Sequence, residues 1–195
     1  ETTTTLNVGL DFKLLNNLFM GIVEFYKANT TDLLLDRTIS ATTGFAVSRF
    51  NVGELENKGL EASLTSNIIN KKDFEWSLGL IFSRNKNKVI ALTGVFDENG
   101  KEIDINDTDG RRLSVGQSIN NIWLPKFDGI YQEGDNIEGS GNPLAKPGDV
   151  RVVDQDGNGQ IDSRDNVFTN TDPDWYGSIT NTIRFKNFEL FADIY

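Results

Sequence analysis

The sequence lacks most of the side chains that catalytic and metal sites use. Its 195 residues include no cysteine, no histidine, one methionine and four prolines. The absence of cysteine excludes a disulfide framework, a thiolate metal site and a cysteine nucleophile. The absence of histidine removes the usual general base and the commonest ligand for transition metals. Composition alone therefore excludes sites that depend on cysteine or on histidine.

The charge of the sequence is strongly one-sided. Asp and Glu number 29 against 19 Lys and Arg, which gives a formal net charge of -10. Binding to nucleic acid requires a basic face that neutralises phosphates, so we expect no nucleic-acid partner. The sequence also has no run of about 18 consecutive apolar residues, the length that a transmembrane helix needs.

Apolar and polar residues alternate with a period of two over several stretches, which is the pattern of β-strands. The first stretch places Leu6, Val8, Leu10 and Phe12 on one face and Thr5, Asn7, Gly9 and Asp11 on the other. Residues 18–26 are apolar on both faces, and no helical stripe of useful length occurs. We predict an all-β fold, an antiparallel meander of about six strands, at about residues 3–14, 18–28, 58–69, 74–84, 174–186 and 188–194.

The connections between the predicted strands differ sharply in length. Short polar turns fall at residues 15–17, 70–73 and 186–187, and long connections fall at about 29–57 and 85–173. This layout is typical of outer-membrane barrels, which have short periplasmic turns and longer extracellular loops. Soluble sandwiches usually join strands by a few residues, although any antiparallel sheet with one buried face also alternates. The pattern favours a partial transmembrane β-barrel segment and leaves a sandwich open.

Residues 154–165 match the twelve-residue calcium loop of EF-hand proteins position by position. Side-chain oxygens fall at positions one, three and five, and Gly159 falls at position six, where the chain must turn sharply. Position seven would offer its backbone carbonyl, and position nine would act through water. The predicted ligands of a Ca²⁺ ion are Asp154, Asp156, Asn158, Gln160, Asp162 and Asp165.

Position twelve of this loop departs from the EF-hand pattern. It is Asp165, where the standard loop has a bidentate glutamate. An aspartate here resembles dockerin-like calcium loops, and the preceding Val150, Val152 and Val153 are typical of a strand rather than a helix. We expect a structural calcium ion, because several adjacent carboxylates repel one another without a cation. The alternative is an Asp/Asn/Gly-rich turn that binds no metal.

Several segments resemble one family of membrane proteins and occur in that family's order. Residues 51–61, Asn-Val-Gly-Glu-Leu-Glu-Asn-Lys-Gly-Leu-Glu, are similar to its N-x-G-x-x-x-N-x-G-x-E element. The other matching segments are residues 1–12, 83–89, 116–119, 127–132, 147–151 and 172–177. The family is that of the SusC/RagA-type TonB-dependent outer-membrane transporters, and the resemblance covers nearly the whole chain.

The resemblance implies that residues 1–195 are a fragment of the C-terminal half of a barrel domain in the cell outer membrane. The sequence begins and ends inside alternating stretches, so we expect a segment of a longer polypeptide. Such a protein imports oligosaccharides, or sometimes peptides, and is not an enzyme. Its implied partners are a SusD-like surface lipoprotein, TonB through a region outside this sequence, the ligand and outer-membrane lipid. The connections at about 29–57 and 85–173 would be extracellular.

The main alternative is a secreted, calcium-stabilised β-sandwich that binds carbohydrate on Trp123, Tyr131 and Trp175. Topology separates the two interpretations, because a sandwich buries its alternating rows between two packed sheets. A glycoside hydrolase with paired carboxylates is disfavoured. Most acidic residues lie in the calcium-type loop or in solvated stretches such as Asp97-Glu98.

Overall fold

The computed structural model describes residues 1–106, 112–137 and 141–195. No helix among these residues is long and apolar enough to cross a membrane. The chain forms two compact units, one of residues 1–103 with 173–195 and one of residues 104–172. Each unit has its own strand pairings.

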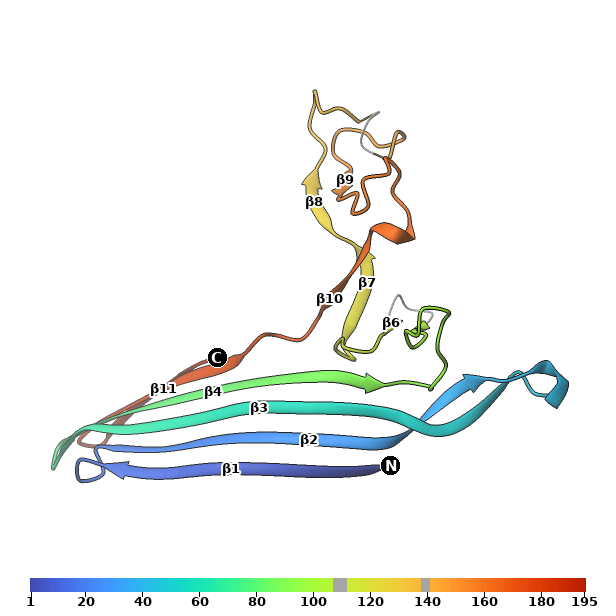
Figure 1. Cartoon of the computed structure of the whole chain (residues 1–195). Helices are drawn as coiled ribbons and strands as arrows, with labels where there is room; N and C mark the ends of the chain where they lie inside the picture. The colour runs from blue at the N-terminus through green and yellow to red at the C-terminus, as the bar shows by residue number, and fades with distance from the viewer. Residues whose placement is uncertain (107–111, 138–140) are drawn as a thin grey trace. The chain divides into compact units, whose positions relative to one another are not determined.

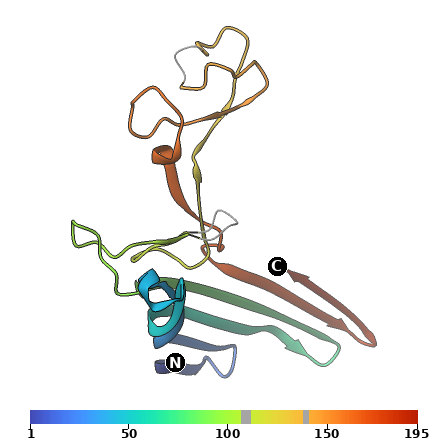
Figure 2. The ribbon, with the colours of Figure 1, turned by 90° about the vertical axis from the view of Figure 1, so that its right-hand side faces the viewer.

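The first unit is a single six-stranded antiparallel sheet in the order β1-β2-β3-β4-β11-β12. Its strands run side by side in Figures 1 and 2. Each strand pairs with its neighbour along the chain, and the second unit is inserted between β4 and β11. This arrangement confirms the predicted meander. The strands are β1 (Thr2–Leu14), β2 (Phe19–Thr38), β3 (Val47–Lys71), β4 (Phe74–Ala91), β11 (Tyr176–Phe185) and β12 (Phe188–Ile194).

The predicted loop at 29–57 is wrong in its bounds, because β2 and β3 extend through most of it. Only residues 39–46 lie between the two strands, and they contain the 3-10 helix η1 (Ala41–Thr43). The alternation is interrupted here by register shifts between Thr30 and Leu33 and between Leu33 and Leu34. Asp32 lies inside this irregularity with φ 59°. A bulge of this kind hides the period of two while the strands continue. The predicted connection at 85–173 likewise starts later, after β4 ends at Ala91.

One face of the sheet carries most of its large apolar side chains. Directly opposed residues share a face in an antiparallel pair, and the register opposes Val8 to Phe25 and Phe25 to Leu60. Leu10 opposes Val23 in the next row of the same face. No second sheet covers these rows, since Leu10 is 64% exposed, Val8 60% and Phe25 45%. Because the rows are not sealed between sheets, the β-sandwich interpretation is wrong for the described residues.

Aromatic residues lie near both ends of this apolar face. Trp76 lies close to the short β3–β4 turn, and its indole Nε1 donates a hydrogen bond to Asn181 Oδ1 at 2.9 Å. Trp175 precedes β11 at the opposite end, and its ring stacks on Phe82 with centroids 6.2 Å apart. Girdles of aromatic residues at both interfaces are a property of outer-membrane barrels. The two tryptophans occupy the positions that such girdles would have on this face.

The opposite face of the sheet is mainly polar. Thr180 Oγ1 donates a hydrogen bond to Asp193 Oδ1 at 2.9 Å across β11 and β12. Arg184 bridges two carboxylates, with Nε 2.7 Å from Glu189 and Nη1 3.3 Å from Glu75. Arg184 thus lies between carboxylates of opposite charge on the two neighbouring strands. Cross-strand pairs of opposite charge stabilise a solvent-exposed sheet face.

Two glycines leave room for aromatic rings from neighbouring strands. Gly59 opposes Tyr26, and a Cβ atom at Gly59 would lie 2.5 Å from the Tyr26 ring. On the apolar face, a Cβ atom at Gly21 would overlap the ring of Phe12. Coverage of a strand glycine by a cross-strand aromatic ring pins the register of a sheet. The lack of a side chain at Gly59 and Gly21 thus fixes how β1, β2 and β3 align.

The second unit consists of short paired strands. β7 (Asn121–Pro125) pairs with β10 (Asn166–Asn170), β5 (Ile105–Asn106) with β6 (Arg112–Leu113), and β8 (Phe127–Ile130) with β9 (Val150–Val152). The Trp123 and Phe168 rings pack with centroids 4.4 Å apart, and the Arg112 guanidinium lies 4.6 Å from the Trp123 ring centre. The 3-10 helix η2 (Ser163–Asp165) leads directly into β10. The β7–β10 ribbon therefore holds the end of the residue 154–165 loop (Figure 1).

We predict that Gly59→Ala lowers the stability of the sheet, because the added methyl group forces the Tyr26 ring out of its place. Overpacking of this kind typically costs ~1–3 kcal/mol. Thermal unfolding of the detergent-solubilised receptor that contains this chain would measure the change. Gly79→Ala is the control, since its Cβ atom would meet the nearest atom, Thr180 Cβ, at an ordinary 3.4 Å. Equal unfolding midpoints for the two variants would contradict the prediction.

Candidate metal centre

The calcium-type loop is held at three points within its own unit. At its start, Val153 N donates to Lys126 O at 2.9 Å, next to the β8–β9 ribbon. In its middle, Ile161 N donates to Gly141 O at 3.1 Å, and the half-buried Ile161 is the expected apolar anchor at position eight. At its end the chain enters η2 and then β10. The absence of two long flanking helices agrees with the expectation from the sequence.

Three of the predicted ligands converge. Asp154, Asp156 and Asp165 each place a carboxylate oxygen within 4.8 Å of those of the other two. Asp165 is fully buried, Asp154 is half-buried and Asp156 is exposed. No other group of three or more acidic residues meets this spacing among the described residues. Carboxylates at this separation repel one another, and hard oxygen atoms are the ligands that calcium prefers.

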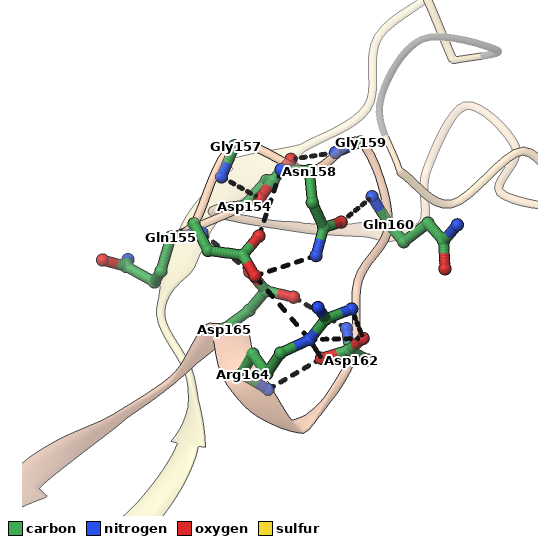
Figure 3. A network of polar contacts seen from close by, with 10 residues as sticks. Asp154, Gln155, Gly157, Asn158, Gly159, Gln160, Asp162, Arg164 and Asp165 are labelled. Atoms are coloured by element: carbon green, nitrogen blue, oxygen red, sulfur yellow. Dashed lines mark hydrogen bonds and ion pairs between the residues drawn. The ribbon is translucent and has the colours of Figure 1, made fainter.

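The turn of the loop is built around Asp154. Its Oδ1 accepts a hydrogen bond from Gly157 N at 2.7 Å, and its Oδ2 accepts one from Gly159 N at 2.8 Å (Figure 3). Gly159 has φ +77° and Gly157 has φ +70°, a region that glycine occupies without strain. The bond from Gly159, followed by that from Gly157, lowers the pKa of the Asp154 carboxyl. Asp154 is therefore held in the charged form that a cation requires.

Asn158 and Gln160 lie in the loop without joining the carboxylate cluster. Asn158 Oδ1 accepts a hydrogen bond from Gln160 N at 2.7 Å, and its Nδ2 donates to Asp156 Oδ2 at 2.8 Å. The Gln160 side chain points away from the loop interior (Figure 3). Gln160 can therefore offer its backbone carbonyl, as position seven requires. The Asn158 amide oxygen would have to leave the Gln160 N–H to become a ligand.

Asp162 is engaged by a residue that the loop pattern does not include, Arg164. The Arg164 Nη2–Asp162 Oδ2 distance is 2.6 Å, and Arg164 Nε lies 3.1 Å from both carboxylate oxygens. These bonds lower the pKa of Asp162 to about 2. Arg164 Nε also lies 3.7 Å from Asp156 Oδ2. The guanidinium thus supplies one positive charge beside the cluster and holds Asp162 away from direct coordination.

Asp165 closes the loop. Its Oδ1 accepts a hydrogen bond from Gln155 N at 2.8 Å and its Oδ2 one from Asp162 N at 2.7 Å. With the bond from Arg164 N to Asp162 Oδ1, this is a capping box at the start of η2. The shorter side chain at position twelve is therefore buried at the joint between the two ends of the loop. The spacing Asp162-x-x-Asp165 is a capping signal that could have predicted η2.

The aromatic residues proposed as stacking platforms do not form one. Tyr131 is 3% exposed, so its ring is not available to a ligand and its assignment as a platform is wrong. The Trp123 ring contacts Phe168 and Arg112. Trp175 is exposed but lies in the other unit, against Phe82.

Comparison with known proteins identifies relatives along almost the whole chain. It is 34% identical over 200 residues to TonB-dependent receptor P3 of Formosa agariphila, covering 97% of this chain and 20% of that protein. It is also 34% identical over 198 residues to TonB-dependent receptor SusC of Bacteroides thetaiotaomicron, covering 97% of this chain and 18% of that protein. No family model matches the sequence.

Solved structures of a peptide transporter show the same fold. The structure of the RagAB peptide transporter superposes with a TM-score of 0.71 at 23% identity, over 98% of this chain and 20% of that one. The RagAB peptide importer in its open-open state superposes with a TM-score of 0.72 at 20% identity. The chain spans about one fifth of the length of these relatives. With its six-stranded meander, this chain belongs to the SusC/RagA-type family of TonB-dependent receptors, as a segment of the barrel.

Proposed function

We propose that this chain forms part of the wall of an outer-membrane importer that works with TonB and a SusD-like surface lipoprotein. The observation that carries the proposal is the sorting of side chains by the six-stranded sheet. One face presents exposed apolar rows such as Val8–Phe25–Leu60, and the other presents polar groups such as Thr180 and Asp193. A barrel wall needs lipid on one side and water on the other.

The connections of the sheet support the same orientation. The short turns between paired strands lie at one end of the sheet, at residues 15–18, 72–73 and 186–187. At the other end, β2 and β3 extend far beyond their neighbours, and the 104–172 unit follows β4. Outer-membrane barrels place short turns in the periplasm and long connections outside the cell. We therefore assign the hairpin around 39–46 and the 104–172 unit to the extracellular side, where the lipoprotein partner would bind.

The substrate we propose is an oligosaccharide, with peptides as the second candidate. The relatives include SusC, and the superposed structures are described as peptide transporters. The relatives are named as receptors, which supports a transport wall rather than a catalytic domain. Energy would come from TonB acting on regions outside this sequence.

The uptake proposal predicts a nutrient phenotype. Cells without the receptor that contains this chain should lose import of one class of labelled oligomer, because diffusion through general pores does not replace active uptake of large substrates. Uptake of fluorescent oligosaccharides and peptides, with and without the proton-motive force, measures the effect. Normal energised uptake of both classes in the deletion strain would contradict the proposal.

The partner proposal predicts a separable role for the 104–172 unit. Replacement of this unit by a short Gly/Ser linker should leave the sheet folded, because all strand pairs of the six-stranded sheet lie outside it. Co-purification of the surface lipoprotein with the receptor should fall at least tenfold. A linker placed instead in the β11–β12 turn is the control. Unchanged co-purification after removal of the unit would contradict this assignment.

We also propose that the 154–165 loop binds a structural calcium ion. The support is the convergence of Asp154, Asp156 and Asp165 within 4.8 Å and the complete burial of Asp165. The Gln160 carbonyl and a water held by Asp162 would complete a shell of hard oxygens. The ion would tie the end of β9 to the start of η2 and stabilise the unit without taking part in transport chemistry.

Calcium titration of the receptor by calorimetry should give a heat that Asp154→Asn weakens by at least tenfold, because a carboxylate ligand is lost. Asp149→Asn is the matched control, since Asp149 Oδ2 accepts a hydrogen bond from Lys146 N outside the loop. Affinity should fall only as the pH drops below 3.8, the ordinary pKa of an aspartate, because the lowered pKa of Asp154 keeps this ligand deprotonated until then. Equal heats for the wild-type protein and Asp154→Asn would contradict calcium binding at this loop.

A further inference from the structure

Three lysines stand directly opposite one another on neighbouring strands of the apolar face. The register opposes Lys27 of β2 to Lys58 of β3, and Lys58 to Lys86 of β4. Like charges in directly opposed positions destabilise a sheet. We call these three residues, Lys27, Lys58 and Lys86, the lysine row. Its cost requires a compensating negative charge.

The chain itself supplies only part of that charge. Lys27 Nζ lies 2.7 Å from Glu56 Oε2, and Lys58 Nζ lies 3.6 Å from Glu56 Oε1. The Glu56 carboxylate is thus shared between two lysines. No ion pair joins Lys86 or the neighbouring Arg84 to a carboxylate within the described part of the chain. Glu56 is therefore the only carboxylate that the described residues pair with these four cations, and the register places a fifth cation, Lys88, directly opposite it.

Three of these cations line a hollow on the sheet surface, together with two large apolar side chains. A surface pocket of about 240 Å³ is lined by Phe25, Lys58, Gly59, Leu60, Arg84 and Lys86. Three of these six residues are cationic, and all three are exposed. The hollow opens beside the Val8–Phe25–Leu60 row of the apolar face. Its chemistry suits an anionic headgroup whose hydrocarbon part continues along that row.

The position of the row along the strands matches a membrane boundary. From Trp76, beside the short turn, to Arg84 the strand covers roughly 27 Å at about 3.4 Å per residue. With a tilt near 40° this corresponds to roughly 21 Å across the membrane, close to the ~25 Å apolar band of outer-membrane barrels. Lys86 lies two residues beyond Arg84 on β4, so the lysine row is the next row away from the short turns. On the proposed orientation, it lies at the outer-leaflet headgroups.

We propose that Lys58 and Lys86 of the lysine row, together with Arg84, bind the phosphate of a phosphorylated lipid in the outer leaflet, with its acyl chains against Val8, Phe25 and Leu60. Lysine binds phosphate through a single charged ammonium group, and arginine binds it through two parallel N–H hydrogen bonds. Several such cations around one hollow therefore suit the double negative charge of a phosphomonoester. The inference rests on the proposed function, because the leaflet follows from the assigned orientation. The site adds a specific lipid contact to the wall.

The test is a binding measurement on the complete receptor in neutral detergent. Phosphorylated lipid A, the same lipid after enzymatic dephosphorylation, and inorganic phosphate are titrated while the thermal midpoint is followed. The phosphorylated lipid should raise the midpoint, and the other two should not. A Lys58→Gln/Lys86→Gln variant should need at least tenfold more lipid for the same shift.

The matched control is Lys71→Gln/Lys72→Gln, which removes the same charge at the short-turn end of β3 and β4. It should bind lipid as the wild-type protein does. Lys86→Gln alone, with an expected loss of about threefold or more, serves if the double variant does not fold. Equal responses of wild type and variants, or equal shifts with dephosphorylated lipid, would overturn the inference. A receptor that binds the lipid but imports neither class of oligomer would overturn the proposed function alone.

Discussion

The structure depends on the in-register antiparallel pairing of β2, β3 and β4. Side chains alternate along a strand, so a shift of one residue in any pairing would move every apolar group to the opposite face. Tyr26 lying over Gly59 and Phe12 lying over Gly21 oppose such a shift, because the rings fit only across residues without side chains. The separation of an apolar from a polar face follows from this alignment.

The same alignment explains which parts of the sheet the sequence could predict. Where the period of two is unbroken, as at Leu6–Phe12, strand and face both follow from the residues. The alternation fails at Thr30–Leu34, where a bulge changes the register while hydrogen bonding continues, so the strand extension is not visible in the pattern. The short strands of residues 104–172 are set instead by contacts such as Trp123–Phe168, which join residues far apart in the sequence.

The candidate metal centre was predictable to a similar extent. The spacing of Asp154, Asp156 and Asp165 was sufficient to place three carboxylates together, because the turn at Gly159 is a local backbone property. The spacing did not reveal what else competes for oxygen atoms. Arg164 forms an ion pair with Asp162, and the Gln160 N–H donates a hydrogen bond to the Asn158 amide oxygen. Such competition depends on side-chain conformation, which a position-by-position motif does not encode.

The lysine row has a consequence for the bilayer around the protein. Phosphorylated lipids in one leaflet repel one another and are normally held together by free divalent cations, whose local concentration varies with the medium. The cationic groups that the sheet holds at Lys58, Arg84 and Lys86 would replace those mobile ions along the protein's perimeter. The seal between wall and leaflet would then tolerate depletion of magnesium better than the surrounding lipid does.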